Sequence, residues 1–390
     1  MLKAITEKGK YVTLAILPKR QIELLRKRVK FYCPECNEQV IVRAGPKVIP
    51  HFAHKNSSNC SIRSGGEGTY HQYGKLLLYE WFQKQNIPTQ LEAFIPQINQ
   101  RPDLLIKTKQ LTFAVEFQCA TISAKDIQHR NTGYERLNIL PIWILGGNQF
   151  NRISTNHMAL NDFTLQFIHQ FSSKLPTTIF YFCPQRKNFS IIHDLILTST
   201  NRALVNFTFK KMNETSFPKL FTPSYFSEKR LFSLWRPEKR KFRLKNTNVY
   251  GREYIWKKWL YEKRLHVQHL PSIVHLPIRS QYSMSVPTWN WQSRFIIDFL
   301  HSLKVGDSFS LKQAAQYLRP FQSDNTNNRF IVPKVSPIVE YLTYLHDLKI
   351  IQIMSSNLYK KCKPITFYNH IEQSLEGDDE LLNSFMYNHN

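Results

Sequence analysis

The spacing of apolar residues changes repeatedly between residues 67 and 150, and these changes predict a compact α/β module. Apolar positions at helical spacing alternate with short apolar runs, which are typical of strands. The expected elements are a helix over 67–83, strands over 91–95, 103–106 and 111–118, a helix over 124–137 and a strand over 139–145. Because the last run is apolar at almost every position, it predicts a strand buried on both faces.

The segments on either side of this module have different patterns. A strand over 11–16 and a short basic helix over 22–28 predict a small N-terminal β unit. Residues 291–368 combine helical patterns with a final hairpin, as a winged helix does. Such a region could grip duplex DNA or dock a protein. The acidic end of the chain predicts either disorder or masking of the chain's own basic surface.

Together these patterns predict an α/β core with a small N-terminal β/zinc-binding module and a mostly α-helical C-terminal region. The expected parts are a β/zinc-binding module over 1–64, an α/β domain over 65–150, a basic aromatic region over 151–290, a winged-helix-like domain over 291–368 and an acidic tail over 369–390.

The net charge of the chain indicates a class of binding partner. The 390 residues include 53 Lys and Arg against 28 Asp and Glu, a net charge of +25. A chain this basic usually binds a polyanion, and nucleic acid is the leading candidate. No apolar run approaches the ~18 residues of a membrane span. Residues 1–7 lack the apolar core of a signal peptide, so a cytoplasmic location is expected.

The basic residues concentrate in one segment. Residues 228–264 contain thirteen Lys and Arg against four Glu, interleaved with aromatic residues. Basic side chains can reach phosphates while aromatic rings stack on unpaired bases. The candidate nucleic-acid contacts in this segment are Lys239, Arg240, Lys241, Trp256, Lys257, Lys258 and Trp259. The alternative is an amphipathic helical subdomain whose aromatic side chains form its core.

Cysteines and histidines cluster between residues 33 and 60. Cys33 and Cys36 form a Cys-x₂-Cys knuckle, and His51, His54 and Cys60 follow. Two closely spaced thiolates and two ligands from a second arm suit tetrahedral Zn²⁺. Either histidine could be the fourth ligand; we favour His54, because His-x₅-Cys makes a compact second arm. Four protein ligands leave no open position, so the predicted zinc is structural.

Carboxylates at two of the predicted strands suggest a second metal. Asp103 begins one strand, and Glu116 and Gln118 point to the same side of the next, opposite Val115 and Phe117. If these strands pair, Asp103 and Glu116 can converge on one Mg²⁺, a metal suited to phosphodiester cleavage. An uncompensated carboxylate such as Glu116 in an apolar run is costly, which also favours a metal partner.

Two helices could complete this site. Glu67, His71 and Lys75 are spaced to share one helix face. Glu67 could be a third acidic group, His71 could transfer a proton or contact phosphate, and Lys75 could contact nucleic acid. Arg130 and Tyr134 on the next helix could orient phosphate. The alternatives are a solvated helix stripe for the first set, and an ordinary salt bridge and a packed ring for the second.

An ordered set of these motifs resembles a known family. The residues that carry the resemblance are Cys33-Pro34-Glu35-Cys36, His51-Phe52-Ala53-His54, Cys60, Glu67, His71, Arg101-Pro102-Asp103, Glu116-Phe117-Gln118, Ile122-Ser123, Arg130, Tyr134 and Trp143-Ile144-Leu145. The chain resembles the competence protein CoiA family over residues 1–150, and more weakly beyond. That family is similar to PD-(D/E)xK nucleases, so the resemblance implies a restriction-endonuclease-like core and a nuclease-like domain over 65–150. It also implies Asp103 and Glu116 as Mg²⁺ or Mn²⁺ ligands and Glu67 as a helix-borne acid.

The resemblance also has a departure and a biological setting. Gln118 stands where the motif usually has Lys, and Gln can only hydrogen-bond, whereas Lys would also supply charge. The family association is with natural transformation, DNA uptake and recombination.

We therefore predict a DNA-binding nuclease that processes internalised single-stranded or branched DNA or recombination intermediates, in contact with recombination proteins. The main alternative is a non-catalytic single-strand binder or recombination mediator. A zinc-finger and winged-helix regulator is a third interpretation, but it leaves Asp103 and Glu116 without a role.

Overall fold

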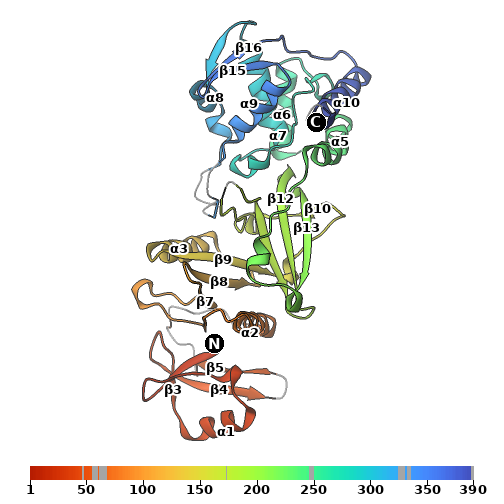
Figure 1. Ribbon diagram of the computed structural model, residues 1–390. Coiled ribbons are helices and arrows are strands. Elements are labelled where there is room, and N and C mark those ends of the chain that lie inside the picture. Colours follow the sequence, from red (N-terminus) through yellow and green to blue (C-terminus); the bar gives the residue numbers. More distant parts are fainter. Residues whose placement is uncertain are drawn as a thin grey trace. The chain divides into compact units, whose positions relative to one another are not determined.

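The computed structural model describes residues 1–45, 48–54, 60, 68–172, 174–245, 250–323, 330–331 and 335–387, and the chain divides into two compact units (Figure 1). Unit 1 comprises Met1–Phe150, Ile179–Ile191 and Thr208–Thr222. Unit 2 comprises Asn151–Thr178, Ile192–Phe207 and Pro223–Asn390. The long strands β12 (Asn188–Ser199) and β13 (Arg202–Lys211) each have one end in each unit, so the units interleave along the sequence.

The N-terminal part of unit 1 is an antiparallel sheet with strand order β2-β1-β3-β4-β5. Its elements are β1 (Lys3–Thr6), β2 (Tyr11–Thr13), α1 (Lys19–Arg28), β3 (Phe31–Tyr32), β4 (Gln39–Gly45) and β5 (Val48–His54). Val40 and Val42 of β4 are buried beside more exposed neighbours, the alternation expected of a strand with one face in a core. Phe31 and Phe52 pack in that core, with their ring centroids 4.8 Å apart.

The rest of unit 1 has the helix, strands, helix, strand order that its periodicity predicts. Its elements are α2 (Thr69–Lys84), β6 (Thr89–Leu91), β7 (Leu104–Lys107), β8 (Thr112–Gln118), α3 (Ala124–Arg136), β9 (Ile139–Gly146) and β11 (Thr178–Cys183). The strand order is β11-β9-β8-β7-β6. β6, β7 and β8 pair antiparallel, whereas β8 with β9 and β9 with β11 pair in parallel. β9 is buried at almost every position, as its apolar run predicts.

One predicted strand has different limits in the structure. The apolar run over 91–95 is not the strand; β6 ends at Leu91, and Glu92 has a left-handed backbone with φ of 46°. A non-glycine residue rarely adopts this conformation. The chain therefore leaves the sheet at Glu92.

Unit 2 contains β10, parts of β12 and β13, and a C-terminal region of helices and a small sheet. β10 (His157–Ala159) pairs antiparallel with β13. The remaining elements are α4 (Asp162–Leu165), α5 (Glu228–Leu244), α6 (Gly251–Glu262), α7 (Thr288–Arg294), β14 (Ser308–Ser310), α8 (Leu311–Leu318), α9 (Pro337–Asp347), β15 (Ile351–Ser355), β16 (Leu358–Lys361) and α10 (Ile371–Tyr387). No helix within the described ranges is long and apolar enough to cross a membrane.

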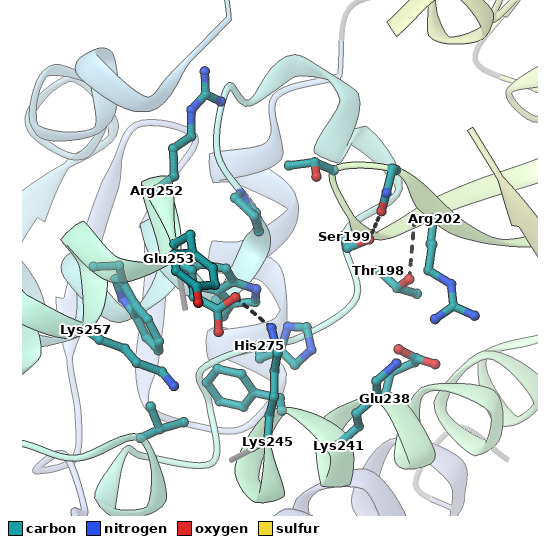
Figure 2. A pocket seen from close by; sticks show the side chains of 18 residues that line it. Thr198, Ser199, Arg202, Glu238, Lys241, Lys245, Arg252, Glu253, Lys257 and His275 are labelled. Atoms are coloured by element: carbon teal, nitrogen blue, oxygen red, sulfur yellow. Dashed lines mark hydrogen bonds and ion pairs between the residues drawn. The ribbon is translucent and has the colours of Figure 1, made fainter. Parts of the chain in front are cut away.

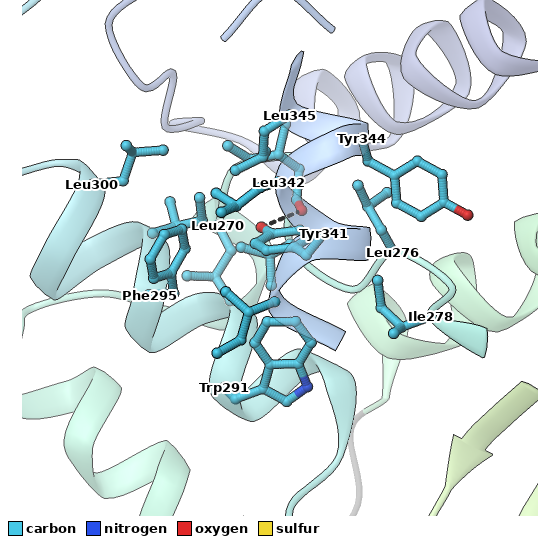
Figure 3. Close-up of a cluster of buried hydrophobic side chains, with 14 of the residues drawn as sticks. Leu270, Leu276, Ile278, Trp291, Phe295, Leu300, Tyr341, Leu342, Tyr344 and Leu345 are labelled. Carbon is cyan, nitrogen blue, oxygen red and sulfur yellow. Dashed lines mark hydrogen bonds between the residues drawn. The ribbon is translucent and has the colours of Figure 1, made fainter. Parts of the chain in front are cut away.

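The C-terminal elements follow the order predicted for a winged helix. A π-helical turn (Phe295–Leu300) continues α7, and β14, α8, α9 and the β15–β16 hairpin follow it, with sheet order β14-β16-β15. α8 starts at a capping box in which Ser310 and Gln313 each accept a hydrogen bond from the other's backbone N–H. Trp291, Phe295, Tyr341 and Leu345 form part of the core shown in Figure 3.

The acidic end of the chain is folded through Tyr387, so the prediction of disorder is wrong there. Residues 371–387 form α10, which packs against α5. Asp378 is buried and accepts two hydrogen bonds from Arg243, from Nε and Nη2, both at 2.9 Å. The negative charge of this helix is thus used to bind a basic helix of the same chain.

Candidate active site and metal cluster

Asp103 lies directly before β7 and is held by groups from two neighbouring elements. Its Oδ2 accepts a hydrogen bond from the Phe117 N–H of β8 at 2.9 Å and lies 3.1 Å from His71 Nε2 of α2. Its Oδ1 is 3.4 Å from Lys75 Nζ. Burial alone would raise the pKa of Asp103, but His71 and Lys75 outweigh it and lower the pKa. Asp103 is therefore ionised at neutral pH.

Glu116 lies opposite Asp103 on the neighbouring strand. Leu104 of β7 pairs with Val115 of β8, and one further step of this antiparallel register brings Asp103 beside Glu116. Glu116 is 2% exposed. Burial raises its pKa against the attraction of Arg130, and the nearby Asp103 raises it further. The two carboxylates predicted to converge are thus neighbours with pKa values shifted in opposite directions.

The other predicted residues lie around this pair in different ways. Arg130 Nη1 lies 2.7 Å from Glu116 Oε1, and the Tyr134 hydroxyl donates to the same oxygen. The structure thus shows the salt-bridge alternative for these two residues, although the Arg130 side chain is still 33% exposed. Gln118 donates from Nε2 to the Ala120 carbonyl at 2.5 Å. Glu67 lies outside the described residues.

Lys75 is a buried member of the site, not a surface contact for nucleic acid as predicted. Its side chain is 0% exposed, and its Nζ lies 2.6 Å from Glu92 Oε1. Glu92 Oε2 accepts hydrogen bonds from the N–H groups of Leu2 at 2.9 Å and Lys3 at 3.3 Å. Lys75 and Arg101 lower the pKa of Glu92 to about 2 despite its burial. Lys75 therefore joins two ionised carboxylates, Glu92 and Asp103.

The cysteine cluster of the N-terminal module has the ligand set that its spacing predicts. Cys33, Cys36, His54 and Cys60 place their ligand atoms within 4.8 Å of one another. Cys33 Sγ is 4.0 Å from Cys60 Sγ, and Cys36 Sγ is 3.3 Å from His54 Nε2. Two thiolates bound to one zinc lie roughly 3.8 Å apart when each Zn–S bond is about 2.3 Å. These residues fit a tetrahedral zinc ion and could bind one.

The alternative histidine is not part of that cluster. His51 Nδ1 lies 2.8 Å from the Ile49 carbonyl oxygen. Among the described residues, the ligand set consists of Cys33, Cys36, His54 and Cys60 and does not include His51. The structure thus favours His54 over His51.

A short chain of charged side chains links this cluster to the carboxylate site. Glu35 lies between Cys33 and Cys36, and its Oε2 accepts from Cys33 Sγ at 3.2 Å. Its Oε1 is 2.8 Å from Arg101 Nη1, which in turn lies 3.8 Å from Glu92 Oε2. The Arg101 side chain is 7% exposed. The metal cluster and the nuclease-like site therefore share buried ion pairs.

Comparison with known proteins identifies the family. Family models of competence protein CoiA match residues 14–63 as the N-terminal domain, 67–225 as the nuclease-like domain and 232–375 as the C-terminal domain. Competence protein CoiA of Bacillus subtilis (strain 168) is 33% identical over 282 residues, covering 71% of this chain and 74% of that protein. The chain belongs to the competence protein CoiA family. No solved structure matches it.

Sequence reasoning missed several charged residues in and next to the nuclease-like domain of this family member. Glu92 received no role, although it is a single carboxylate within the apolar run 91–95. The argument that selected Glu116, the cost of a lone buried carboxylate, applies equally to Glu92. Glu35 and Arg101 were also unassigned, and both lie directly beside predicted site residues.

The basic segment of unit 2 divides into core and surface residues. Lys239 is 1% exposed and donates to the carbonyls of Ser272 and Val274 at 2.7 and 2.6 Å. Trp256 is also buried, so these two predicted nucleic-acid contacts are core residues. Trp259 is half-buried, with the Arg294 guanidinium 4.3 Å from its ring centroid. Arg240, Lys241 and Lys258 are exposed, and Lys257 is half-buried.

Proposed function

We propose that this CoiA family member is a metal-dependent deoxyribonuclease whose site is built on Asp103 and Glu116. The supporting observation is the antiparallel register that sets these two carboxylates side by side, with Asp103 fixed to β8 through the Phe117 N–H. Carboxylates paired across two neighbouring strands suit Mg²⁺ or Mn²⁺, which also bind phosphate oxygens and water. The nuclease-like domain match over residues 67–225 covers this site.

The chain's own residues would divide the work as follows. Asp103 is the permanently charged ligand, since His71 and Lys75 keep it ionised. Glu116 is the second ligand and is steered by Arg130 and Tyr134. A bound Mg²⁺ or Mn²⁺ would supply a Lewis acid and lower the pKa of its water. His71, half-buried beside Asp103, is suited to hold or pass a proton at Nε2.

The positive charge that Gln118 lacks is present elsewhere in the site. Lys75 is fully buried, so it positions Asp103 and Glu92 and does not touch a substrate. The partly exposed Arg130 is the cation that can reach a phosphate while it still holds Glu116. Gln118 can orient a water molecule or phosphate oxygen by hydrogen bonding.

The biological role proposed with this activity is processing of internalised DNA, in single-stranded or branched form, during natural transformation. The name of the relative from Bacillus subtilis supports the link to competence. We place the protein in the cytoplasm, where it would meet recombination proteins. The zinc cluster would stabilise the N-terminal module next to the site.

A second candidate function is strand binding without cleavage. The supporting observation is the Gln118 amide, which donates to the Ala120 carbonyl and carries no charge for a phosphate. On this alternative the protein would escort single-stranded DNA or act as a recombination mediator.

Cleavage of labelled single-stranded, duplex and branched DNA in Mg²⁺, Mn²⁺ or no divalent metal decides between these functions. The test variants are Asp103→Asn and Glu116→Gln. Glu80→Gln is the matched control, because Glu80 is an exposed carboxylate of α2. We expect metal-dependent cutting by the wild type and the control only. Binding without cutting by all four proteins would support the escort function instead.

A further inference from the structure

A cavity of about 520 Å³ in unit 2 opens between α5, α6 and the turn that joins β12 to β13 (Figure 2). Cations from all three elements line it, namely Arg202, Lys241, Lys245, Arg252 and Lys257. The set extends from residue 202 to residue 257, and the fold gathers it around one opening.

Most of this positive charge is not neutralised within the protein. Lys245 Nζ lies 2.6 Å from Glu253 Oε2, so the charges of these two residues neutralise each other. Among the residues that the structure describes, no carboxylate lies within ion-pair distance of Lys241, Lys257 or Arg202. Arg252 donates to the neutral carbonyl of Ser285 at 2.8 Å and keeps its charge. The cavity therefore presents unpaired cations, which attract an anion.

The wall and rim of the cavity are aromatic. Trp256 and Trp289 pack with their ring centroids 4.4 Å apart, and Phe242 lies beside them. Tyr250 lines the same cavity and is 81% exposed. An exposed ring next to unpaired cations suits a nucleotide whose base is free to stack, because cations bind the phosphate while the ring contacts the base. Bases inside a duplex do not offer that face.

A second cavity, of about 790 Å³, continues from the first. Residues 198–201, at the end of β12 and in its turn to β13, line both cavities, as do Arg252 and Pro287. Asp162 and Arg252 are the charged residues that line the second cavity, whereas five cations and two carboxylates, Glu238 and Glu253, line the first. The excess positive charge therefore lies in the first cavity. Thr198 and Ser199 donate their hydroxyl hydrogens to the Arg202 carbonyl and to Asn201 Oδ1. The Thr200 hydroxyl, which lines both cavities, can donate to a phosphate oxygen. The joined cavities offer an extended chain room for more than one nucleotide.

We propose that this cavity binds single-stranded nucleic acid, with phosphates against Lys241, Lys257 and Arg202 and a base stacked on Tyr250. The site deepens the proposed function by adding a strand-binding surface in unit 2, and it rests on that function only for its biological purpose. Binding itself requires neither cleavage nor a metal.

Fluorescence anisotropy with a labelled 15-mer of thymidylate tests this site. The full chain carries Asp103→Asn throughout, so that the proposed cleavage cannot consume the strand. Lys241→Gln/Lys257→Gln is compared with Lys304→Gln/Lys312→Gln, which changes two exposed lysines of unit 2 outside the cavity. We expect about tenfold weaker binding for the cavity variant, and a slope of log affinity against log salt that is smaller by about 1.4.

Tyr250→Ala separates stacking from charge. It should weaken binding about tenfold while the salt slope stays unchanged. Cavity variants that bind like the control pair would overturn the proposal. An equal loss for a DNA hairpin would overturn the single-strand assignment. Cleavage is measured separately on protein with Asp103 intact, so a failure of the nuclease proposal would leave this binding result standing.

Discussion

Each unit buries a lysine in a cluster of charged side chains, yet the two clusters differ in which charge is in excess. In unit 2, Lys239 and Arg243 surround the single carboxylate of Asp378. Backbone carbonyls accept their remaining hydrogens; Arg243 Nη1, for example, donates to Leu270 at 2.7 Å. In unit 1, two cations, Lys75 and Arg101, pair with the three carboxylates of Glu92, Asp103 and Glu35.

The two clusters also differ in their access to solvent. The Asp378 side chain is 6% exposed and enclosed by its partners, whereas Asp103 and His71 are 13% and 18% exposed. Burial of charge is thus a poor guide to function by itself, since structural ion pairs also shift pKa values. An excess of carboxylate at a site that solvent can reach is what distinguishes unit 1.

The largest expected effect separates the two clusters by activity. Asp103→Asn should lower metal-dependent cleavage about thousandfold, because it removes a charged ligand at the reacting phosphate. Asp378→Asn should leave cleavage per folded molecule unchanged. Single-turnover assays, with the folded fraction set by circular dichroism, measure both. Equal losses would show that the Asp103 cluster has no special catalytic part.

Removing the lysine should separate the clusters by stability. Lys75→Met leaves two buried carboxylates without their shared cation and should cost about 3–5 kcal/mol of unfolding free energy. Lys239→Met should cost only about 1–2 kcal/mol, since Asp378 keeps two hydrogen bonds from Arg243. Urea unfolding gives both values. Adding Glu92→Gln to Lys75→Met should recover part of the first loss, and a failure to do so would contradict the assigned pairing.

The stability of each cluster should depend on pH in a different range, acidic for Glu92 and alkaline for Lys239. Glu92 has a folded pKa of about 2 against an ordinary 4.5, so its stabilisation is complete above 4.5 and is lost as the pH falls towards 2. Burial lowers the pKa of Lys239 from 10.5 to about 8 against the attraction of Asp378. The folded state then holds fewer protons than the unfolded one, so stability rises between pH 8 and 10.5.

Each limb should amount to about 2–3 kcal/mol, because both side chains are almost fully buried. Glu92→Gln should flatten the acid limb and Lys239→Met the alkaline limb, as measured by denaturant unfolding across the pH range. A variant that flattens the other limb would show that these residues are not the titrating groups.

The smallest effect concerns the link between the metal cluster and unit 1's carboxylates. A zinc-selective chelator should lower wild-type cleavage about tenfold, as loss of an outer support of a metal site does. Arg101→Met should cause a similar decrease by itself and make the chelator nearly without further effect. Arg136→Met, an exposed arginine of α3, is the control and should retain full sensitivity. Additive losses would show that zinc acts by another route.

Local sequence patterns predict most of the secondary structure, the Asp103–Glu116 pair and the Cys/His cluster. Periodicity places α2, β8, α3 and β9, and the pairing of Asp103 with Glu116 follows from adjacent strands. Ligand spacing predicts Cys33, Cys36, His54 and Cys60. Each of these inferences needs only residues that are near in sequence or paired by one short turn.

Long-range contacts were beyond such reasoning. Glu92 is held by the N–H of Leu2, ninety residues away, and helix spacing cannot show that Lys75 faces the protein interior. Consecutive domain boundaries likewise miss the return of Ile179–Ile191 and Thr208–Thr222 into unit 1. Charge density alone could not divide residues 228–264 into the buried Lys239 and the exposed Lys241.

Because Glu35 of the Cys33–Cys36 knuckle pairs with Arg101, the N-terminal module and the nuclease-like domain are not independent of one another. A recombinant fragment limited to residues 67–225 would keep Arg101 and Glu92 but lose Glu35 and the Leu2 and Lys3 amides that hold them. Its charged interior would open to water on one side. Truncated or domain-exchanged proteins are therefore expected to fold only when the N-terminal module is kept together with its own nuclease-like domain. During divergence, substitutions in one of the two should be accompanied by substitutions in the other.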